Sequence, residues 1–183
     1  MKRDTDAAIR GTGIPVRDLR GDARTLSREE FADRHGGAFL LLSAAELSLA
    51  RGPSQTEVCL DDGGPRRGES TVGLSLVAFP VRRGASSAGH LITVGRTADN
   101  DLVIPDLSIS RFHAFVKQGP RGEWLIHDAG STNGSTLNGR SVPQQGAGSA
   151  AELKSGDDVR LGQVELTFLE AEAMIAFALK VER

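Results

Sequence analysis

Short apolar runs of strand length recur along the chain from residue 74 onward, each bounded by Gly, Pro, Asp or Asn. The clearest pair spans residues 158–161 and 164–169, where apolar and polar residues alternate on both sides of a turn at Gly162. Many short antiparallel strands of this kind pack as a β-sandwich, because each buries one face against a second sheet. The other strands predicted in this way span residues 74–81, 91–95, 102–104, 112–117, 124–128 and 136–138.

The residues before this region do not share its pattern. Residues 1–24 alternate charge with Gly and show neither helical nor strand period, so they are predicted to be a flexible tail. Ser27 and Glu30 have the spacing of a capping box, which predicts a helix from Arg28 to about His35, ended by Gly36-Gly37. Residues 39–42 and 57–60 each fit a strand, and the Leu/Ala stretch between them fits a helix equally well.

The domain organisation follows from these patterns. Residues 61–71 contain three Gly, one Pro and no apolar residue, which is typical of a linker, and a domain boundary is expected near residue 72. Residues 25–71 are too few for comfortable independent stability, so they are predicted to be an accessory segment packed on the core. The sandwich is expected over residues 72–170, and an apolar stripe at helical spacing predicts a C-terminal helix over 171–183.

Composition excludes several classes of function. The net charge of −2 on 183 residues lacks the basic excess of a nucleic-acid-binding domain. Cys59 is the single cysteine, so an internal disulfide or a multi-cysteine zinc site cannot form, and the four histidines lack metal-ligand spacing. The longest apolar stretch is too short to cross a membrane, and no apolar signal core follows the first residues. A cytoplasmic protein without metal or cofactor is therefore expected.

Three clusters between residues 95 and 139 carry the chemistry. They are Gly95-Arg96, Ser110-Arg111-Phe112-His113, and the run Ser131-Thr132-Asn133-Gly134 followed by Asn138-Gly139. Each lies next to a predicted strand, and loops at one end of a sandwich lie side by side. Guanidinium groups, hydroxyls and Gly-rich backbone together suit an oxyanion, since Arg offers a planar fork of donors to phosphate.

In their order and spacing these motifs resemble the forkhead-associated (FHA) family of phosphothreonine-recognition domains. The resemblance implies an eleven-stranded antiparallel β-sandwich whose loops bind a phosphothreonine peptide without catalysis. It places Arg96, Ser110, Arg111 and Thr132 on the phosphate and Asn133 on the peptide backbone. It leaves Gly95, His113 and Gly134 with roles in loop structure. Ser135 stands where relatives often have Thr. Ser108 stands where some relatives have an arginine that reads the third residue after the phosphothreonine, which puts an acidic preference there in doubt.

Plainer interpretations remain for some of these residues. Ser110 fits a turn cap, Arg111 a solvated loop charge, and the Thr132 hydroxyl serves either the loop or the ligand. The imidazole of His113 is explained by hydrogen bonds to loop backbone alone. No nucleophile elbow, Walker loop or kinase motif is present, so an enzyme is not expected.

The hypothesis is therefore an adaptor that binds a threonine-phosphorylated partner in a Ser/Thr kinase pathway, with no nucleic-acid or membrane partner. The rival is a phosphate-independent scaffolding module that self-associates, because residues 39–42 need covering.

Overall fold

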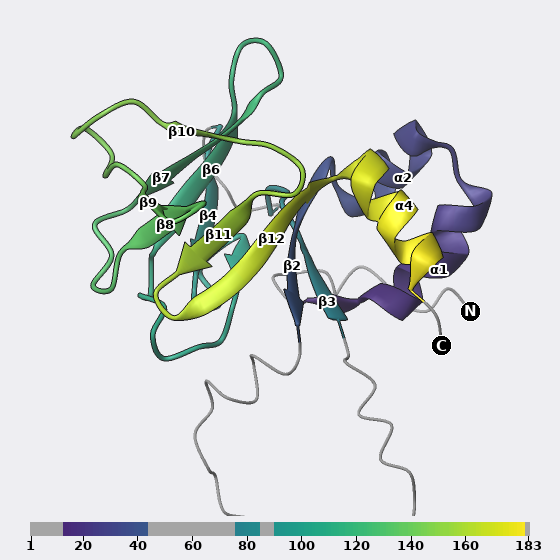
Figure 1. Ribbon diagram of the computed structural model, residues 1–183, viewed down its shortest axis with the longest axis horizontal. Helices are drawn as coiled ribbons and strands as arrows, with labels where there is room; N and C mark the ends of the chain where they lie inside the picture. Colours follow the sequence, from purple (N-terminus) through teal and green to yellow (C-terminus); the bar gives the residue numbers. More distant parts are fainter. Residues whose placement is uncertain (1–12, 44–75, 85–89, 182–183) are drawn as a thin grey trace, which may run out of the picture.

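The sandwich consists of a seven-stranded and a five-stranded sheet in the computed structural model, which describes residues 13–43, 76–84 and 90–181 (Figure 1). Strand order in the larger sheet is β1-β3-β2-β12-β11-β8-β9, and in the smaller sheet β10-β7-β6-β4-β5. Neighbouring strands are antiparallel except β4 and β5, which are parallel. The strands are β1 (Ile14–Pro15), β2 (Ala38–Ser43), β3 (Leu76–Pro80), β4 (Ile92–Gly95), β5 (Leu102–Val103), β6 (Ala114–Gln118), β7 (Trp124–Asp128), β8 (Ser135–Leu137), β9 (Arg140–Ser141), β10 (Ala151–Leu153), β11 (Asp158–Leu161) and β12 (Val164–Glu170).

The predicted sandwich is confirmed, and its most regular strands lie where the alternation placed them. β7 and β11 have the predicted bounds, and β12 extends one residue beyond its prediction. Gly162 makes the turn between β11 and β12 with a φ of 61°, in the left-handed region that favours glycine. β9 and β10 were not predicted, because β9 (Arg-Ser) has no apolar residue and β10 (Ala-Glu-Leu) has no apolar run. β2 to β12 make up the expected eleven strands, and β1 is a twelfth.

The main core lies between the two sheets. Alternate residues of the facing strands point into it, among them Leu40 of β2, Val116 of β6 and Phe168 of β12, all at most 1% exposed. The ring of Trp124 packs edge-on against Phe168 with their centroids 6.3 Å apart. Because these contacts join strands far apart in sequence, the core holds the strand ends, and the loops that follow them, in fixed positions.

A second core covers the outer face of the seven-stranded sheet. Three helices form it: α1 (Val16–Thr25), α2 (Arg28–His35) and α4 (Ala171–Lys180), which gather beside β2 and β3 (Figure 1). Phe39 and Leu41 point to this helical layer, and Leu40 and Leu42 point to the main core. The continuous apolar run of β2 therefore has a physical cause, since both of its faces are buried.

Two predictions about the N-terminal region are wrong. The tail predicted over residues 1–24 is structured from residue 14, because Val16, Leu19 and Ala23 bury one face of α1 in the helical layer. The sandwich also does not begin near residue 72 as predicted. β2, which lies before that position, pairs with β3 and β12 inside the larger sheet. The segment that contains β2 thus contributes a strand to the core and is more than an accessory packed on it. Residues 1–12 and the predicted strand and linker at 57–60 and 61–71 lie outside the described residues.

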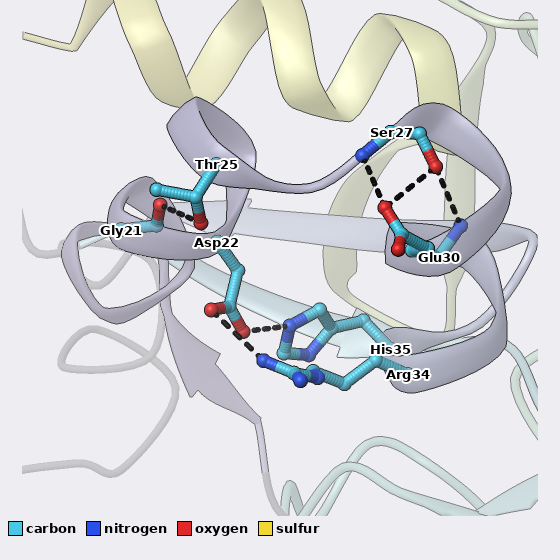
Figure 2. A network of polar contacts seen from close by, with 7 residues as sticks. All are labelled: Gly21, Asp22, Thr25, Ser27, Glu30, Arg34 and His35. Carbon is cyan, nitrogen blue, oxygen red and sulfur yellow. Dashed lines mark hydrogen bonds and ion pairs between the residues drawn. The ribbon is translucent and has the colours of Figure 1, made fainter.

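Polar contacts fix the entry to α2 and join it to α1 (Figure 2). The capping box is present as predicted: the Glu30 main-chain N–H donates to Ser27 Oγ, and the Ser27 main-chain N–H donates to Glu30 Oε2 at 2.9 Å. Asp22 accepts from His35 Nε2 at 2.8 Å and from Arg34 at 3.1 Å. Burial alone would raise the pKa of Asp22, but the hydrogen bonds from His35 and Arg34 outweigh it and lower the pKa.

α4 begins at Ala171, as predicted, and packs on α1 and α2. In the part of the chain that the structure describes, none of the helices has the length and apolar character needed to cross a membrane.

Candidate functional site

Three loops at one end of the sandwich meet around Ser110. The first follows β4 and begins with Arg96, the second joins β5 to β6, and the third joins β7 to β8 and contains Thr132. The main-chain N–H of Arg96 donates to the carbonyl of Ser110 at 3.1 Å. The main-chain N–H of Thr132 donates to Ser110 Oγ at 3.0 Å, and Ser110 Oγ lies 3.4 Å from Thr132 Oγ1. Arg96, Ser110 and Thr132, one from each of the three motif clusters, are therefore joined through Ser110, although 36 positions separate Arg96 from Thr132.

The surface of this cluster carries two guanidinium groups beside hydroxyl and amide groups. Arg111, Thr132 and Asn133 are exposed, whereas Arg96 and Ser110 are half-buried. Neither guanidinium has an ion pair among the described residues, and the Nε atom of Arg96 is buried without a hydrogen-bond partner there. An unpaired buried donor costs free energy, so an anion that accepts from it recovers that cost on binding.

His113 is hydrogen-bonded to two of the loops. Its side chain is fully buried; Nδ1 accepts from the Ser110 main-chain N–H at 3.0 Å, and Nε2 lies 3.2 Å from the Gly134 carbonyl. Since the Ser110 N–H occupies Nδ1, the ring proton resides on Nε2 and donates to Gly134. Burial lowers the pKa of His113, which outweighs the raising effect of the Gly134 hydrogen bond, so the ring is held neutral.

Gly95 allows the first two loops to approach closely. A Cβ at this position would overlap the carbonyl oxygen of Arg111 and lie 2.6 Å from Asn100 Nδ2. That amide donates to the Arg111 carbonyl at 2.6 Å and to the Thr97 carbonyl at 3.0 Å. Gly134 has a φ of 74°, in the left-handed region, and so ends the third loop in a conformation that other residues rarely adopt.

Asp128 organises the third loop and was given no role in the sequence interpretation. It is 2% exposed, and its carboxylate accepts from the main-chain N–H groups of Gly130 and Ser131 and from the hydroxyls of Ser131 and Ser135 at 2.6–2.8 Å. Burial would raise the pKa of Asp128, but these four hydrogen bonds lower it. The sequence carries a local signal for this role. Asp128 lies two residues before Gly130 and three before Ser131, a spacing typical of a turn in which an Asp side chain accepts from the backbone N–H groups that follow it. Ser135, which stands where relatives often have Thr, is buried as part of this network.

The two Asn-Gly pairs act on different loops. Asn133 Nδ2 donates to the carbonyl of Ser108 at 2.7 Å and thereby ties the third loop to the second. Asn138, with a φ of 50°, and Gly139, with a φ of 78°, form the turn between β8 and β9. The Ser108 hydroxyl is engaged in the loop, since it donates to Asp106 at 2.6 Å and accepts from the Gln163 main-chain N–H at 3.0 Å. It is not free to read a ligand without breaking these bonds.

Comparisons with known proteins point to one family. A family model described as FHA domain matches residues 92–162. The glycogen accumulation regulator GarA of Mycolicibacterium smegmatis is 33% identical over 96 residues, which are 49% of this chain and 56% of GarA. The solved FHA-1 domain of Rv1747 from Mycobacterium tuberculosis is 30% identical with a TM-score of 0.38, covering 49% of this chain and 91% of that chain. The N-terminal FHA domain of Rad53p from S. cerevisiae, solved with a phosphothreonine peptide, is 26% identical with a TM-score of 0.40, covering 48% and 73%. The chain thus spans about half the length of GarA.

Proposed function

Because this chain belongs to the FHA domain family, we propose that the three loops around Ser110 bind a phosphothreonine peptide and that the protein is an adaptor in Ser/Thr kinase signalling. The observation that carries this proposal is the convergence of three loops that bring two arginines without ion pairs to the Ser110 and Thr132 hydroxyls. Arg96 and Arg111 have no ion pair among the described residues. The main chain of Arg96 is bonded to Ser110, Arg111 follows Ser110 in the chain, and the Ser110 hydroxyl contacts that of Thr132. A phosphate of about −1.5 to −2 charges supplies acceptors for the two arginines.

Each residue has a role that its surroundings support. Arg96 makes charge-assisted hydrogen bonds to the phosphate, and its buried Nε gains an acceptor. The Ser110 hydroxyl lies 3.4 Å from Thr132 Oγ1, a long hydrogen bond, so it turns to a phosphate oxygen at little cost. Arg111 and Thr132 complete the phosphate contacts, and Asn133 holds the peptide backbone as the family resemblance implies. Gly95, His113 and Gly134 hold the loops in place without touching the ligand.

The partner is a protein phosphorylated on threonine by a Ser/Thr kinase, and the chain itself is a binding module without catalytic activity. Selection of phosphothreonine over phosphoserine depends on the loops enclosing the γ-methyl group, as the family resemblance implies. The near-neutral charge and the single cysteine support a cytoplasmic protein without a nucleic-acid partner.

Binding of a phosphothreonine peptide library to the full chain tests the proposal. The same peptides after phosphatase treatment, and a phosphoserine version of each, are the matched controls. We expect binding of the phosphothreonine peptides alone, with an affinity that falls as salt is added. Equal binding of phosphorylated and dephosphorylated peptides would show that the loops do not read phosphate, and would favour phosphate-independent scaffolding.

A further inference from the structure

Two exposed apolar side chains border the proposed phosphate site. Among the described residues, three large apolar side chains are exposed: Leu107 at 82%, Phe112 at 41% and Leu179 at 40%. Leu107 and Phe112 lie in the loop between β5 and β6, on either side of Ser110-Arg111, whereas Leu179 lies on α4. Single exposed apolar residues are common on protein surfaces, but two in one short loop beside a cluster of guanidinium and hydroxyl groups are a feature that needs a cause.

Looseness of the loop is not that cause, because the loop is anchored along its length. Asp106, Ile109 and His113 are buried, and they alternate with the exposed positions. Asp106 Oδ1 accepts from the Ser108 main-chain N–H at 2.8 Å, and the Ile109 N–H donates to the Asp106 carbonyl at 3.1 Å. The backbone therefore holds the side chain of Leu107 outward in a defined position.

The neighbours of the two residues belong to different sheets. Leu107 precedes Ser108, which accepts from Asn133 and from the main chain of Gln163 in the turn of the β11–β12 hairpin. Phe112 packs edge-on against Phe115 of β6 in the smaller sheet, with the ring centroids 4.6 Å apart at 76°. A ligand whose phosphate lies at Ser110 and Arg111 therefore meets one apolar side chain on each side.

The reach of these contacts follows from chain geometry. Five Cα–Cα steps from Leu107 to Phe112 span at most about 18 Å, and the phosphate site lies between them. The Cα of Leu107, three steps from Ser110, is at most about 11 Å from the Cα of Ser110, and Phe112 is adjacent to Arg111. An extended peptide covers about 10 Å in three residues.

We propose that Leu107 and Phe112 are specificity-determining contacts that select threonine-phosphorylated partners with aliphatic or aromatic residues within three positions on both sides of the phosphothreonine. This inference rests on the proposed function of the same site. The chemistry of the loop between β5 and β6 favours apolar residues over acidic ones next to the phosphothreonine of the peptide. In this proposal Arg96 and Arg111 bind the phosphate, so the loop between β5 and β6 keeps no free cation for an acidic side chain. The Ser108 hydroxyl is also occupied, because it is hydrogen-bonded to Asp106 and to the main chain of Gln163.

A peptide library with a fixed phosphothreonine and degenerate flanks, bound to the full chain, tests the inference. Wild type is expected to enrich Leu, Ile, Val, Phe and similar residues within three positions on each side. From the enriched sequence, one apolar-flanked phosphopeptide and a matched peptide with Ser and Gly flanks are then titrated. Leu107→Ser and Phe112→Ser should each weaken the apolar-flanked peptide about five- to tenfold, since a peptide covers only part of each side chain. Both should leave the Ser/Gly-flanked peptide unchanged.

Two further variants keep the result interpretable. Leu179→Ser removes an apolar side chain as exposed as Phe112 but placed on α4, and it should bind both peptides like wild type. Phe112→Leu keeps an apolar contact if loss of the Phe115 packing perturbs the serine variant, and it should retain most of the selectivity. Thermal unfolding of each variant checks that the sandwich is intact.

The outcomes separate this inference from the function beneath it. Phosphothreonine-dependent binding without apolar enrichment, or with enrichment unchanged in Leu107→Ser and Phe112→Ser, overturns the inference and leaves the proposed function standing. Equal binding of phosphorylated and dephosphorylated library overturns both. A concentration-dependent dimer in sedimentation that Phe112→Ser abolishes, with peptide selection unaltered, assigns Phe112 to self-association and also overturns the inference.

Discussion

Replacement of Arg96 by alanine should separate binding from folding. In the described part of the chain the guanidinium makes no ion pair and its Nε has no hydrogen-bond partner, so alanine leaves no protein group unpaired. The hydrogen bond from the Arg96 main-chain N–H to the Ser110 carbonyl is independent of the side chain and is retained. The free energy of unfolding should therefore change by less than about 1 kcal/mol, the lost packing of the half-buried stem being the main cost.

The effect on binding should be much larger. A hydrogen bond to a charged group contributes about 1.5 to 3 kcal/mol, and every 1.4 kcal/mol is about tenfold in affinity. Loss of one such bond from Arg96 to the phosphate predicts a 10- to 100-fold weaker complex, and loss of two predicts more. The same variant should bind a dephosphorylated peptide no differently from wild type.

Calorimetric titration with one phosphothreonine peptide and its dephosphorylated form measures this, with urea unfolding of the same samples. Arg160→Ala is the matched control, because Arg160 is an exposed arginine on β11 outside the three loops. It should leave both affinity and stability near wild type. An unchanged dissociation constant for Arg96→Ala, with intact unfolding, refutes the assignment of Arg96 to the phosphate.

Three further changes test the scaffold of the site. Asp128→Ala removes the acceptor of four hydrogen bonds and should lower the free energy of unfolding by about 3 kcal/mol or more, measured by urea unfolding, and weaken phosphopeptide binding; near-wild-type values for both would contradict the role of Asp128. Leu40→Ala opens a cavity in the main core and should cost about 2 to 5 kcal/mol in one cooperative transition, whereas a separate early transition with the rest unaffected would contradict the place of β2 in the sandwich. Burial lowers the pKa of His113 below its usual value of 6.5, so the unfolded chain takes up this proton at higher pH than the folded chain. The contribution of His113 to stability is therefore complete above about pH 6.5 and is lost as pH falls toward the lowered pKa; urea unfolding between about pH 8 and 5 should show this slope, and His113→Gln should reduce it. An equal slope of unfolding free energy against pH in wild type and His113→Gln would contradict a neutral, buried His113 ring.

The fold was predictable from the sequence where structure depends on near neighbours. Alternation along β7 and β11 set their bounds, because a strand between a core and solvent repeats every two residues. The helix α2 was predictable from Ser27 and Glu30, since a capping box is complete within four residues. The meeting of the three loops was predictable as well, because each motif lies next to a predicted strand, and loops at one end of a sandwich lie side by side.

The rest was decided by contacts between distant segments. The apolar run 39–42 fitted a strand, but its sequence did not show which strands and layers cover it; β3, β12 and the helical layer bury both of its faces. α1 resembled a tail because its sequence is polar apart from three positions, and it is ordered by packing on α4 and the sheet. The outward position of Leu107 likewise depends on bonds to Asn133 and Gln163 made through its neighbour Ser108. Local patterns determine where strands, caps and turns occur, whereas which face is covered, and which side chain stays exposed beside the site, depends on long-range packing that no local period encodes.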